Sequence, residues 1–197
     1  MNYERARNEF PLLLNYWGLL EVGVEVGVCE GLHAKCILDY WPGILHLVDP
    51  WSPLVDYQEE YDHERNLQTT LSHLAAHASR YRIHRTTSLE ALRAFEDESL
   101  DFVYLDANHA YEAVRSDLEG WWPKVRVGGM LAGDDYGIIE EQWVDFGHNK
   151  VRFGVKRAVD EWAKKIRRNI SLDIYADWKN SIPGQGELQA RGWYLIK

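Results

Sequence analysis

Short apolar runs, rich in β-branched residues, alternate with stretches of helical spacing along most of the chain. The apolar runs are 22–28, 44–48, 81–85, 101–105 and 127–132, and the helical stretches between them are 33–40, 59–79, 89–95 and 111–122. Strand followed by helix, repeated in this way, predicts an α/β fold with a parallel sheet covered on both faces. The runs are apolar at nearly every position, as expected of strands buried on both sides.

The end of the chain has a different pattern. Residues 137–153 are aromatic and irregular, and residues 155–168 have helical spacing. Two strand-like runs follow at 171–175 and 192–196, separated by a stretch rich in turn residues. These two runs predict an antiparallel pair that closes an otherwise parallel sheet, which is a common mixed arrangement.

The length of 197 residues favours a single domain over two independent units. A helix expected over 3–17 precedes the first strand, so that residues 1–20 are predicted to form a helical cap near the site. The formal net charge of −9 weighs against a nucleic-acid partner, because phosphate contacts need clustered Lys and Arg. The apolar patch after the N-terminus is too short to span a membrane. Two cysteines, Cys29 and Cys36, form no disulfide framework and indicate a reducing, cytoplasmic location.

The turn after the first strand indicates the class of ligand, because ligands of such sheets bind beyond the carboxyl ends of the strands. Gly27 allows a tight turn there, and Gly31 allows helix and strand to approach closely. The middle glycine of the dinucleotide fingerprint is missing, which favours a nucleoside ligand without a diphosphate. Asp49 follows the second strand, where a carboxylate meets ribose hydroxyls in dinucleotide folds. The alternative is that the two glycines serve only tight helix packing.

Three carboxylates follow the fourth and fifth strands. They belong to Asp106, Asp134 and Asp135. If these strands are neighbours, the carboxylates converge and repel one another unless a cation holds them. Oxygen ligands with room for water and substrate suit Mg²⁺ or a similar hard cation. The alternative is that Asp134 or Asp135 caps the loop or the next helix.

His109 follows Asp106 at the mouth of the same crevice. Its imidazole is a candidate general base for a substrate hydroxyl, and the alternative is a histidine at a helix start that bonds the backbone. His73 and His77 have the spacing of two zinc ligands, but no third ligand is evident and a helix face explains them better. The basic stretch 164–168 indicates surface charge at a helix end rather than an RNA contact.

Five ordered motifs resemble those of class I S-adenosylmethionine-dependent methyltransferases. They are Val-Glu-Val-Gly-Val-Cys-Glu-Gly at 24–31, Val-Asp-Pro-Trp at 48–51, Leu-Asp-Ala-Asn-His-Ala-Tyr at 105–111, Asp-Leu-Glu-Gly-Trp-Trp-Pro at 117–123, and Gly-Gly-Met-Leu-Ala-Gly-Asp-Asp-Tyr at 128–136. The last two make the chain similar to the metal-dependent, macrocin-type sugar O-methyltransferases. The resemblance covers about residues 24–162, and the ordered set is more specific than any single motif.

The resemblance implies a doubly wound, Rossmann-like sheet of seven strands, mostly parallel with the last strand antiparallel. It also implies S-adenosylmethionine as cofactor. Glu25, Gly27 and Gly31 would line the methionine part of this cofactor, Asp49 would hold the ribose, and Ser88 would lie near the adenine.

The resemblance also assigns Asp106, Asp134 and Asp135 as metal ligands. This chain departs from its relatives in carrying Ala107 and Asn108, where they often have Gly followed by Asp or Ser. An amide takes up no proton near neutrality, so Asn108 cannot be the base. This favours His109 for that role.

The expected function is Mg²⁺-assisted O-methyl transfer to a hydroxyl of a small molecule, namely a sugar or a glycosylated natural product. The alternatives are a catechol-like phenol as acceptor, a hydroxylase with the same fold, and a non-catalytic S-adenosylmethionine-binding domain. An NAD-dependent reductase is disfavoured by the missing glycine. Such enzymes commonly self-associate, so a homo-oligomer is a further expectation.

The stretch 136–154 is the candidate substrate lid, because it follows the metal residues directly. Its aromatic and histidine residues include Trp143, Phe146, His148 and Phe153, and packing in the core is the alternative for them. Tyr57 and Tyr61, after the second strand, are also predicted to face the acceptor.

Overall fold

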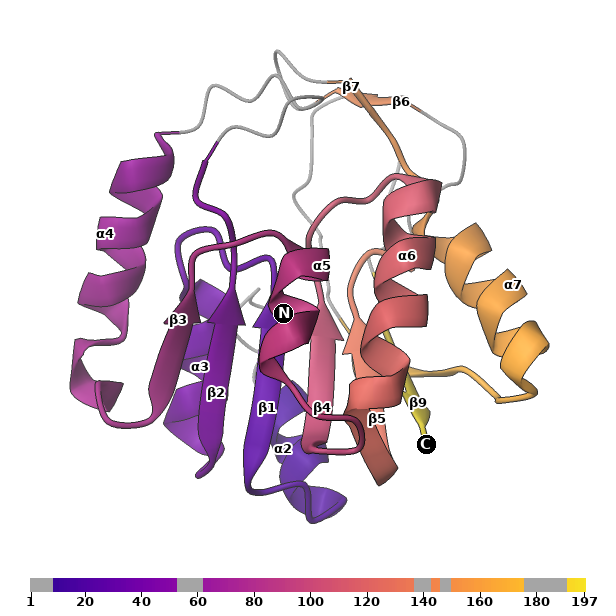
Figure 1. Cartoon of the computed structure of the whole chain (residues 1–197), viewed down its shortest axis with the longest axis horizontal. Coiled ribbons are helices and arrows are strands. Elements are labelled where there is room, and N and C mark those ends of the chain that lie inside the picture. Colours follow the sequence, from indigo (N-terminus) through magenta and orange to yellow (C-terminus); the bar gives the residue numbers. More distant parts are fainter. Residues whose placement is uncertain (1–8, 53–61, 137–142, 146–149, 176–190) are drawn as a thin grey trace.

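The computed structural model describes residues 9–52, 62–136, 143–145, 150–175 and 191–197. Within them, a seven-stranded sheet has the order β3-β2-β1-β4-β5-β9-β8 (Figure 1). The strands are β1 (Val22–Val26), β2 (Ile44–Val48), β3 (Tyr81–His84), β4 (Leu100–Leu105), β5 (Val125–Gly133), β8 (Ser171–Tyr175) and β9 (Arg191–Ile196). Each strand expected from the sequence is present, with small differences at its ends.

The pairing of these strands follows the predicted topology. β1 lies parallel to both β2 and β4, β3 is parallel to β2, and β5 is parallel to β4. β9 runs antiparallel to β5 and to β8. The predicted doubly wound, mostly parallel sheet of seven strands with an antiparallel last strand is therefore confirmed. The strand order reverses between β1 and β4, and this is the point where such sheets bind their ligands.

Helices cover both faces of the sheet (Figure 1). The α-helices are α2 (Glu9–Tyr16), α3 (Leu32–Tyr40), α4 (His63–His73), α5 (Ser88–Ala91), α6 (Tyr111–Trp121) and α7 (Val155–Ile166). In the view of Figure 1, α5 and α6 lie in front of the sheet, whereas α2 and α3 lie behind it. No helix in the described ranges is both long and apolar enough to cross a membrane.

Successive residues of each central strand enter two separate hydrophobic cores, since side chains alternate along a strand. In β4, Val103 and Leu105 pack in one core, which includes residues of α5, α6 and α7. Phe102 and Tyr104 point to the opposite face and pack in the other core, which includes residues of α2 and α3. The two covered faces thus explain why the strands are apolar at most positions.

The helix expected over 59–79 is shorter in the structure. α4 ends at His73, and Leu74 leaves the helical conformation with φ −96° and ψ 5°. Its fully buried side chain enters the core behind the sheet, and a short 3₁₀ turn over Ala75–His77 follows. Helical spacing alone did not reveal this end, because the apolar residues continue through the turn.

The N-terminal helix and the candidate lid are described in part. α2 packs behind the sheet through buried Phe10 and Leu14, and residues 1–8 lie outside the described ranges. In the segment 136–154, β6 (Trp143–Asp145) and β7 (Lys150–Arg152) pair as an antiparallel ribbon, where an irregular segment was expected. The ribbon lies at the same end of the molecule as the carboxyl ends of the parallel strands (Figure 1).

Candidate cofactor pocket and metal centre

A cavity of about 520 Å³ opens at the carboxyl ends of β1, β2 and β4. Of the predicted cofactor residues, four line this cavity directly: Glu25, Gly27, Asp49 and Ser88. Asp106 and His109 line it as well. Residues from separate parts of the sequence therefore meet at the point of the sheet where a ligand was expected.

Gly27 occupies a position that no other residue fits. Its φ of +87° lies in the region that glycine adopts at no steric cost. A Cβ atom here would lie 1.9 Å from the carbonyl oxygen of Asp106. The amide of Gly27 donates to the carbonyl of Val48 at 2.9 Å. The glycine therefore lets the turn after β1 pass closely between its two neighbouring strands.

Gly31 also has a positive φ, of +74°, at the start of α3. Its close neighbour is not a strand, as expected from the sequence, but Thr70 of α4. A Cβ atom on Gly31 would lie 2.8 Å from Cγ2 of Thr70. Gly31 thus supports the wall of the pocket by letting α4 approach the turn over residues 27–31, called here the glycine turn.

Asp49 organises the glycine turn. Its Oδ2 accepts hydrogen bonds from the backbone amides of Val28 at 2.9 Å and Cys29 at 3.0 Å, and its Oδ1 accepts from the amide of Trp51 at 2.7 Å. Each carboxylate oxygen has more than one acceptor direction. Asp49 can therefore hold the turn and still accept a hydrogen bond from a hydroxyl group of a ligand.

Glu25 and His33 form a buried pair on one side of the cavity. Both side chains are nearly inaccessible, and Nδ1 of His33 lies 2.9 Å from Oε1 of Glu25. The imidazole packs against the ring of Tyr104, with centroids 4.3 Å apart, and against Phe10 of α2. The Glu25 carboxylate is thus held in place by a partner that the sequence did not single out.

Cys29 lines the same cavity. Burial, followed by the charge of Asp49, raises the pKa of its thiol to about 11. The thiol therefore stays protonated near neutrality, and a thiolate nucleophile is not expected here.

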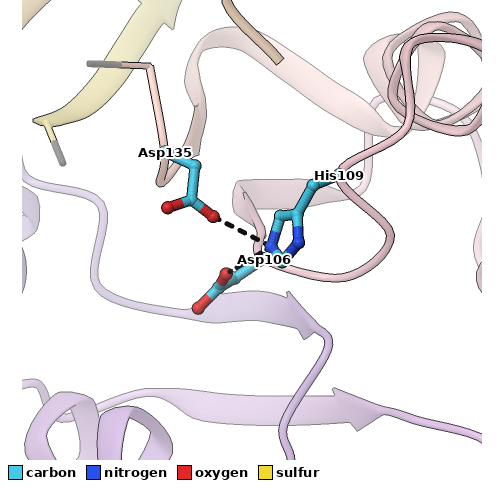
Figure 2. Close-up of side chains that lie close together, drawn as sticks. All are labelled: Asp106, His109 and Asp135. Atoms are coloured by element: carbon cyan, nitrogen blue, oxygen red, sulfur yellow. Dashed lines mark ion pairs between the residues drawn. The ribbon is translucent and has the colours of Figure 1, made fainter. Parts of the chain in front are cut away.

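Asp106, His109 and Asp135 come together beside the pocket (Figure 2). Nε2 of His109 lies 2.8 Å from Oδ2 of Asp135 and 3.6 Å from Oδ1 of Asp106. These residues follow β4 and β5, which are neighbours, with Leu105 paired to Gly133. One ligand atom from each residue lies within 4.8 Å of the others, so the group can hold a metal ion.

Asp134 lies next to this group rather than within it. Its Oδ1 accepts a hydrogen bond from the amide of Asp135 at 2.9 Å, and its carbonyl accepts one from the indole of Trp193 at 3.1 Å. The structure thus brings together two of the three predicted acidic ligands and adds His109. Asp134 orients the backbone of Asp135, which has a positive φ of 65°.

The electrostatics of His109 follow from its neighbours. Burial disfavours the imidazolium, but the carboxylates of Asp135 and Asp106 outweigh this and raise the pKa of His109 to about 10. Nε2 faces these two carboxylates, whereas the buried Nδ1 has no hydrogen-bond partner among the described residues. A buried polar atom without a partner fits a site built for a ligand.

The position of His109 is fixed from two sides. The Phe153 ring stacks on its imidazole, with centroids 4.7 Å apart and planes 7° from parallel. The carbonyl of His109 accepts a hydrogen bond from the amide of Gly154 at 2.9 Å. Phe153, a candidate lid residue, is only 2% exposed and packs in the core, as the alternative expectation held.

Asn108 has a structural role at the start of α6. Its side-chain oxygen accepts a hydrogen bond from the amide of Ala110 at 2.9 Å.

A further polar group was missed in the sequence. Asp117 on α6 is 7% exposed, lines the cavity, and accepts a hydrogen bond from Oγ of Ser88 at 2.5 Å. Burial raises the pKa of Asp117 to about 6. The available signal was its place on the apolar face of α6, together with Val114 and Trp121.

Other candidate residues lie away from this site or outside the described ranges. His73 bonds the carbonyl of Glu30 at 2.9 Å, and His77 bonds Asp39 at 2.8 Å, so the two rings have separate partners. Lys165 pairs with Glu119 at 2.9 Å, as expected of surface charge. Tyr57, Tyr61, Phe146 and His148 are outside the described residues, and only the backbone of Trp143 is described.

Solved structures with a similar fold include several methyltransferases. An O-methyltransferase from Bacillus cereus in complex with SAH has 17% identity and a TM-score of 0.67, over 97% of this chain and 80% of that chain. The O-methyltransferase TomG from Streptomyces achromogenes, in complex with SAM, has 13% identity and a TM-score of 0.64, over 97% and 79%. A Burkholderia thailandensis N1-methyltransferase of 1,6-didemethyltoxoflavin has 12% identity and a TM-score of 0.65, over 99% and 78%. At these identities the likeness concerns the fold.

Sequence comparison gives the family. The curated "Uncharacterized protein y4gI" of Sinorhizobium fredii is 32% identical over 93 residues, which are 47% of this chain and 10% of that protein. The match thus spans about a tenth of that relative's length. Residues 21–136, more than half of the chain, match a family described as "Methyltransferase domain". The chain therefore belongs to this methyltransferase family, within the class I S-adenosylmethionine-dependent methyltransferases.

Proposed function

We propose that the chain transfers a methyl group from S-adenosylmethionine to a hydroxyl of a small molecule, assisted by Mg²⁺ or a similar divalent cation. The observation that carries this proposal is the group formed by Asp106, His109 and Asp135 at the edge of the cofactor pocket. Two of the similar structures belong to proteins named as O-methyltransferases, which supports transfer to oxygen.

Three residues of the pocket would hold the cofactor. Asp49 would accept hydrogen bonds from the ribose hydroxyls while it keeps its hydrogen bonds to the glycine turn. Glu25, paired with His33, would face the ammonium group of the methionine part. Gly27 would let the cofactor approach the backbone, since no side chain projects there. The bound SAH and SAM of similar proteins support this choice of ligand.

The residues present fit a divalent cation. Asp106 and Asp135 offer carboxylate oxygens that converge on the Nε2 side of His109, and such oxygens are ligands that a hard divalent cation prefers. Asp134 would join them as a ligand or hold Asp135 in place through its hydrogen bond. When bound, such a cation lowers the pKa of a coordinated hydroxyl.

His109 would take the proton from the acceptor hydroxyl. Its Nε2 faces both carboxylates, so it lies on the side where a hydroxyl near them would bind. The raised pKa of His109 in the unliganded protein means that the imidazole carries a proton near neutrality. Positive charge gained beside Asp106 and Asp135 would lower that pKa, and His109 then becomes a base.

The cluster and the family resemblance both support the proposed class of acceptor. Two neighbouring hydroxyls on a sugar or a glycosylated natural product would both bind at the cation that Asp106 and Asp135 hold. A catechol-like phenol offers the same pair of oxygens and is the second candidate. The segment 136–154, which begins directly after Asp135, is the proposed lid over the acceptor.

The experiment is a methyl-transfer screen with labelled S-adenosylmethionine over sugars, glycosylated natural products and catechols, each with and without Mg²⁺. Transfer to a vicinal diol of a sugar, dependent on the metal, supports the proposal. Transfer to catechols alone replaces the acceptor class. Binding of S-adenosylhomocysteine without transfer to any acceptor favours a non-catalytic binding domain.

A further inference from the structure

A chain of hydrogen bonds lies in the wall of the cofactor pocket, between α5 and α6. The indole nitrogen of Trp121 donates to Oγ of Ser88 at 2.9 Å, and Oγ of Ser88 donates to Oδ1 of Asp117 at 2.5 Å. Trp121 is fully buried and Asp117 is 7% exposed. Ser88 and Asp117 both line the cavity that holds the glycine turn and Asp49.

The direction of these bonds is fixed by chemistry. The indole of Trp121 can only donate, so Ser88 accepts from it. The hydroxyl proton of Ser88 is then directed to Asp117. Among the described residues, the side chain of Asp117 has no other hydrogen bond, so its second carboxylate oxygen is left as an acceptor. This part of the wall therefore offers a carboxylate oxygen as acceptor, and a ligand that fits it carries a hydrogen-bond donor at this position.

The position of this acceptor relative to Asp49 selects which part of the ligand it meets. Asp49 follows β2, whereas Ser88 follows β3, the next strand toward the edge of the sheet. A nucleoside with its ribose at Asp49 would extend its base toward the ends of α5 and α6. Small or apolar residues, Leu89, Ala107 and Ala113, also line the cavity and suit the faces of a planar base.

We propose that Asp117 is the residue that selects adenine, by accepting a hydrogen bond from the exocyclic amine of the base, with Ser88 holding its carboxylate in place. This inference rests on the proposed S-adenosylmethionine cofactor. A purine with a carbonyl oxygen in place of the amine would turn lone pairs toward the carboxylate. A buried site of this kind rejects a ligand that leaves its polar group unpaired.

The role of Ser88 follows from the same geometry. Its hydroxyl is used in the bonds to Trp121 and Asp117, so Ser88 is a positioning residue rather than the group that reads the base. The acidic function is supplied from α6, far along the sequence from the turn after β3. No carboxylate follows β3 directly, where Thr87, Ser88 and Leu89 stand.

The test is calorimetry on the whole chain with two ligands, S-adenosylhomocysteine and S-inosylhomocysteine, which differ only in the amine and the carbonyl oxygen of the base. The wild-type chain is expected to bind the adenine compound about 10- to 100-fold more tightly. Asp117→Asn, whose amide can donate to a carbonyl oxygen, is expected to remove or reverse this preference. Glu119→Gln is the matched control on the exposed face of the same helix and should keep it.

Each result is decisive. Equal affinity of the wild-type chain for the two compounds overturns the role of Asp117, even if Asp117→Asn does not fold. An unchanged preference in folded Asp117→Asn overturns it as well. If the folded wild-type chain binds neither compound, the proposed cofactor itself is wrong, and the role of Asp117 falls with it.

Discussion

Nε2 of His109 lies 2.8 Å from Oδ2 of Asp135, although the two residues follow different strands. The pairing of β4 with β5 brings them together at the edge of the cofactor pocket. We propose that His109 acts there as the base of the reaction, and a role as metal ligand is the alternative. The two roles make different demands on the imidazole, so they can be separated by substitution.

His109→Gln is predicted to keep most of the affinity for Mn²⁺, measured by calorimetry or by its paramagnetic resonance signal. Turnover should fall by about 10²–10⁴-fold, as expected on loss of a general base. A loss of Mn²⁺ affinity comparable to that of a missing carboxylate would instead make His109 a ligand.

Asp135→Asn is predicted to weaken Mn²⁺ binding by more than the roughly 10- to 100-fold that changes to outer-shell partners cost. S-adenosylhomocysteine should still bind, because Asp135 does not line the cofactor cavity. Asp134→Asn is expected to weaken Mn²⁺ binding as well. Unchanged Mn²⁺ affinity in Asp134→Asn would limit this residue to its hydrogen bond with the Asp135 amide.

Phe153→Leu is predicted to lower turnover about 3- to 10-fold, since the stacked ring that holds the His109 imidazole is lost. The affinity for S-adenosylhomocysteine should not change. Phe102→Leu is the control, because Phe102 is equally buried but lies in the core behind the sheet. Both variants should lose about 1–2 kcal/mol of stability in urea unfolding. An equal fall in turnover in the two variants would show that Phe153 has no specific role in positioning His109.

Gly27→Ala is predicted to lose about 1–3 kcal/mol more stability than Gly18→Ala. Both glycines have positive φ, of +87° and +67°, so the conformational cost of alanine is similar. Only at Gly27 would the new methyl group meet another atom, the carbonyl oxygen of Asp106 at 1.9 Å, while nothing lies within 4 Å at Gly18. Urea unfolding of the two variants measures the difference. Equal losses of stability would show that the new methyl group at position 27 does not clash with the carbonyl oxygen of Asp106.

Asp117 is predicted to make stability depend on pH. Burial raises its pKa from 3.8 to about 6, so the unfolded chain ionises this carboxyl before the folded protein does. The stability associated with the protonated carboxyl is therefore full below pH 3.8 and is lost as the pH rises through about 6. The loss amounts to at most about 3 kcal/mol.

Asp117→Asn lacks this ionisation. The free energy of unfolding of the wild-type chain, relative to Asp117→Asn, should fall between pH 4 and pH 7. A difference that stays constant over this range would mean that burial does not control the carboxyl.

Much of the fold and part of the site could be predicted from the sequence. The runs at β1, β2, β4 and β5 are apolar at most positions because both faces of the sheet are covered, and this pattern is visible without a structure. Asp106 and Asp135 were expected to meet because residues that follow neighbouring parallel strands share one edge of the sheet.

Other features depend on contacts that no local pattern encodes. The bond between Ser88 and Asp117 requires α5 and α6 to lie side by side, and the place of Asp117 on the apolar face of α6 signals burial but does not identify this partner. The neighbour of Gly31 proved to be Thr70 because α4, not a strand, packs over the glycine turn. His109 pairs with Asp135 and not with Asp134, and the positive φ of Asp135 is not apparent from the sequence.

The most direct measurement is the rate of methyl transfer from labelled S-adenosylmethionine to an accepted vicinal diol, before and after removal of metal with EDTA. We predict that EDTA abolishes turnover and that added Mg²⁺ restores it, while S-adenosylhomocysteine binds with nearly unchanged affinity throughout. Full turnover in excess EDTA would show that methyl transfer does not depend on a metal ion.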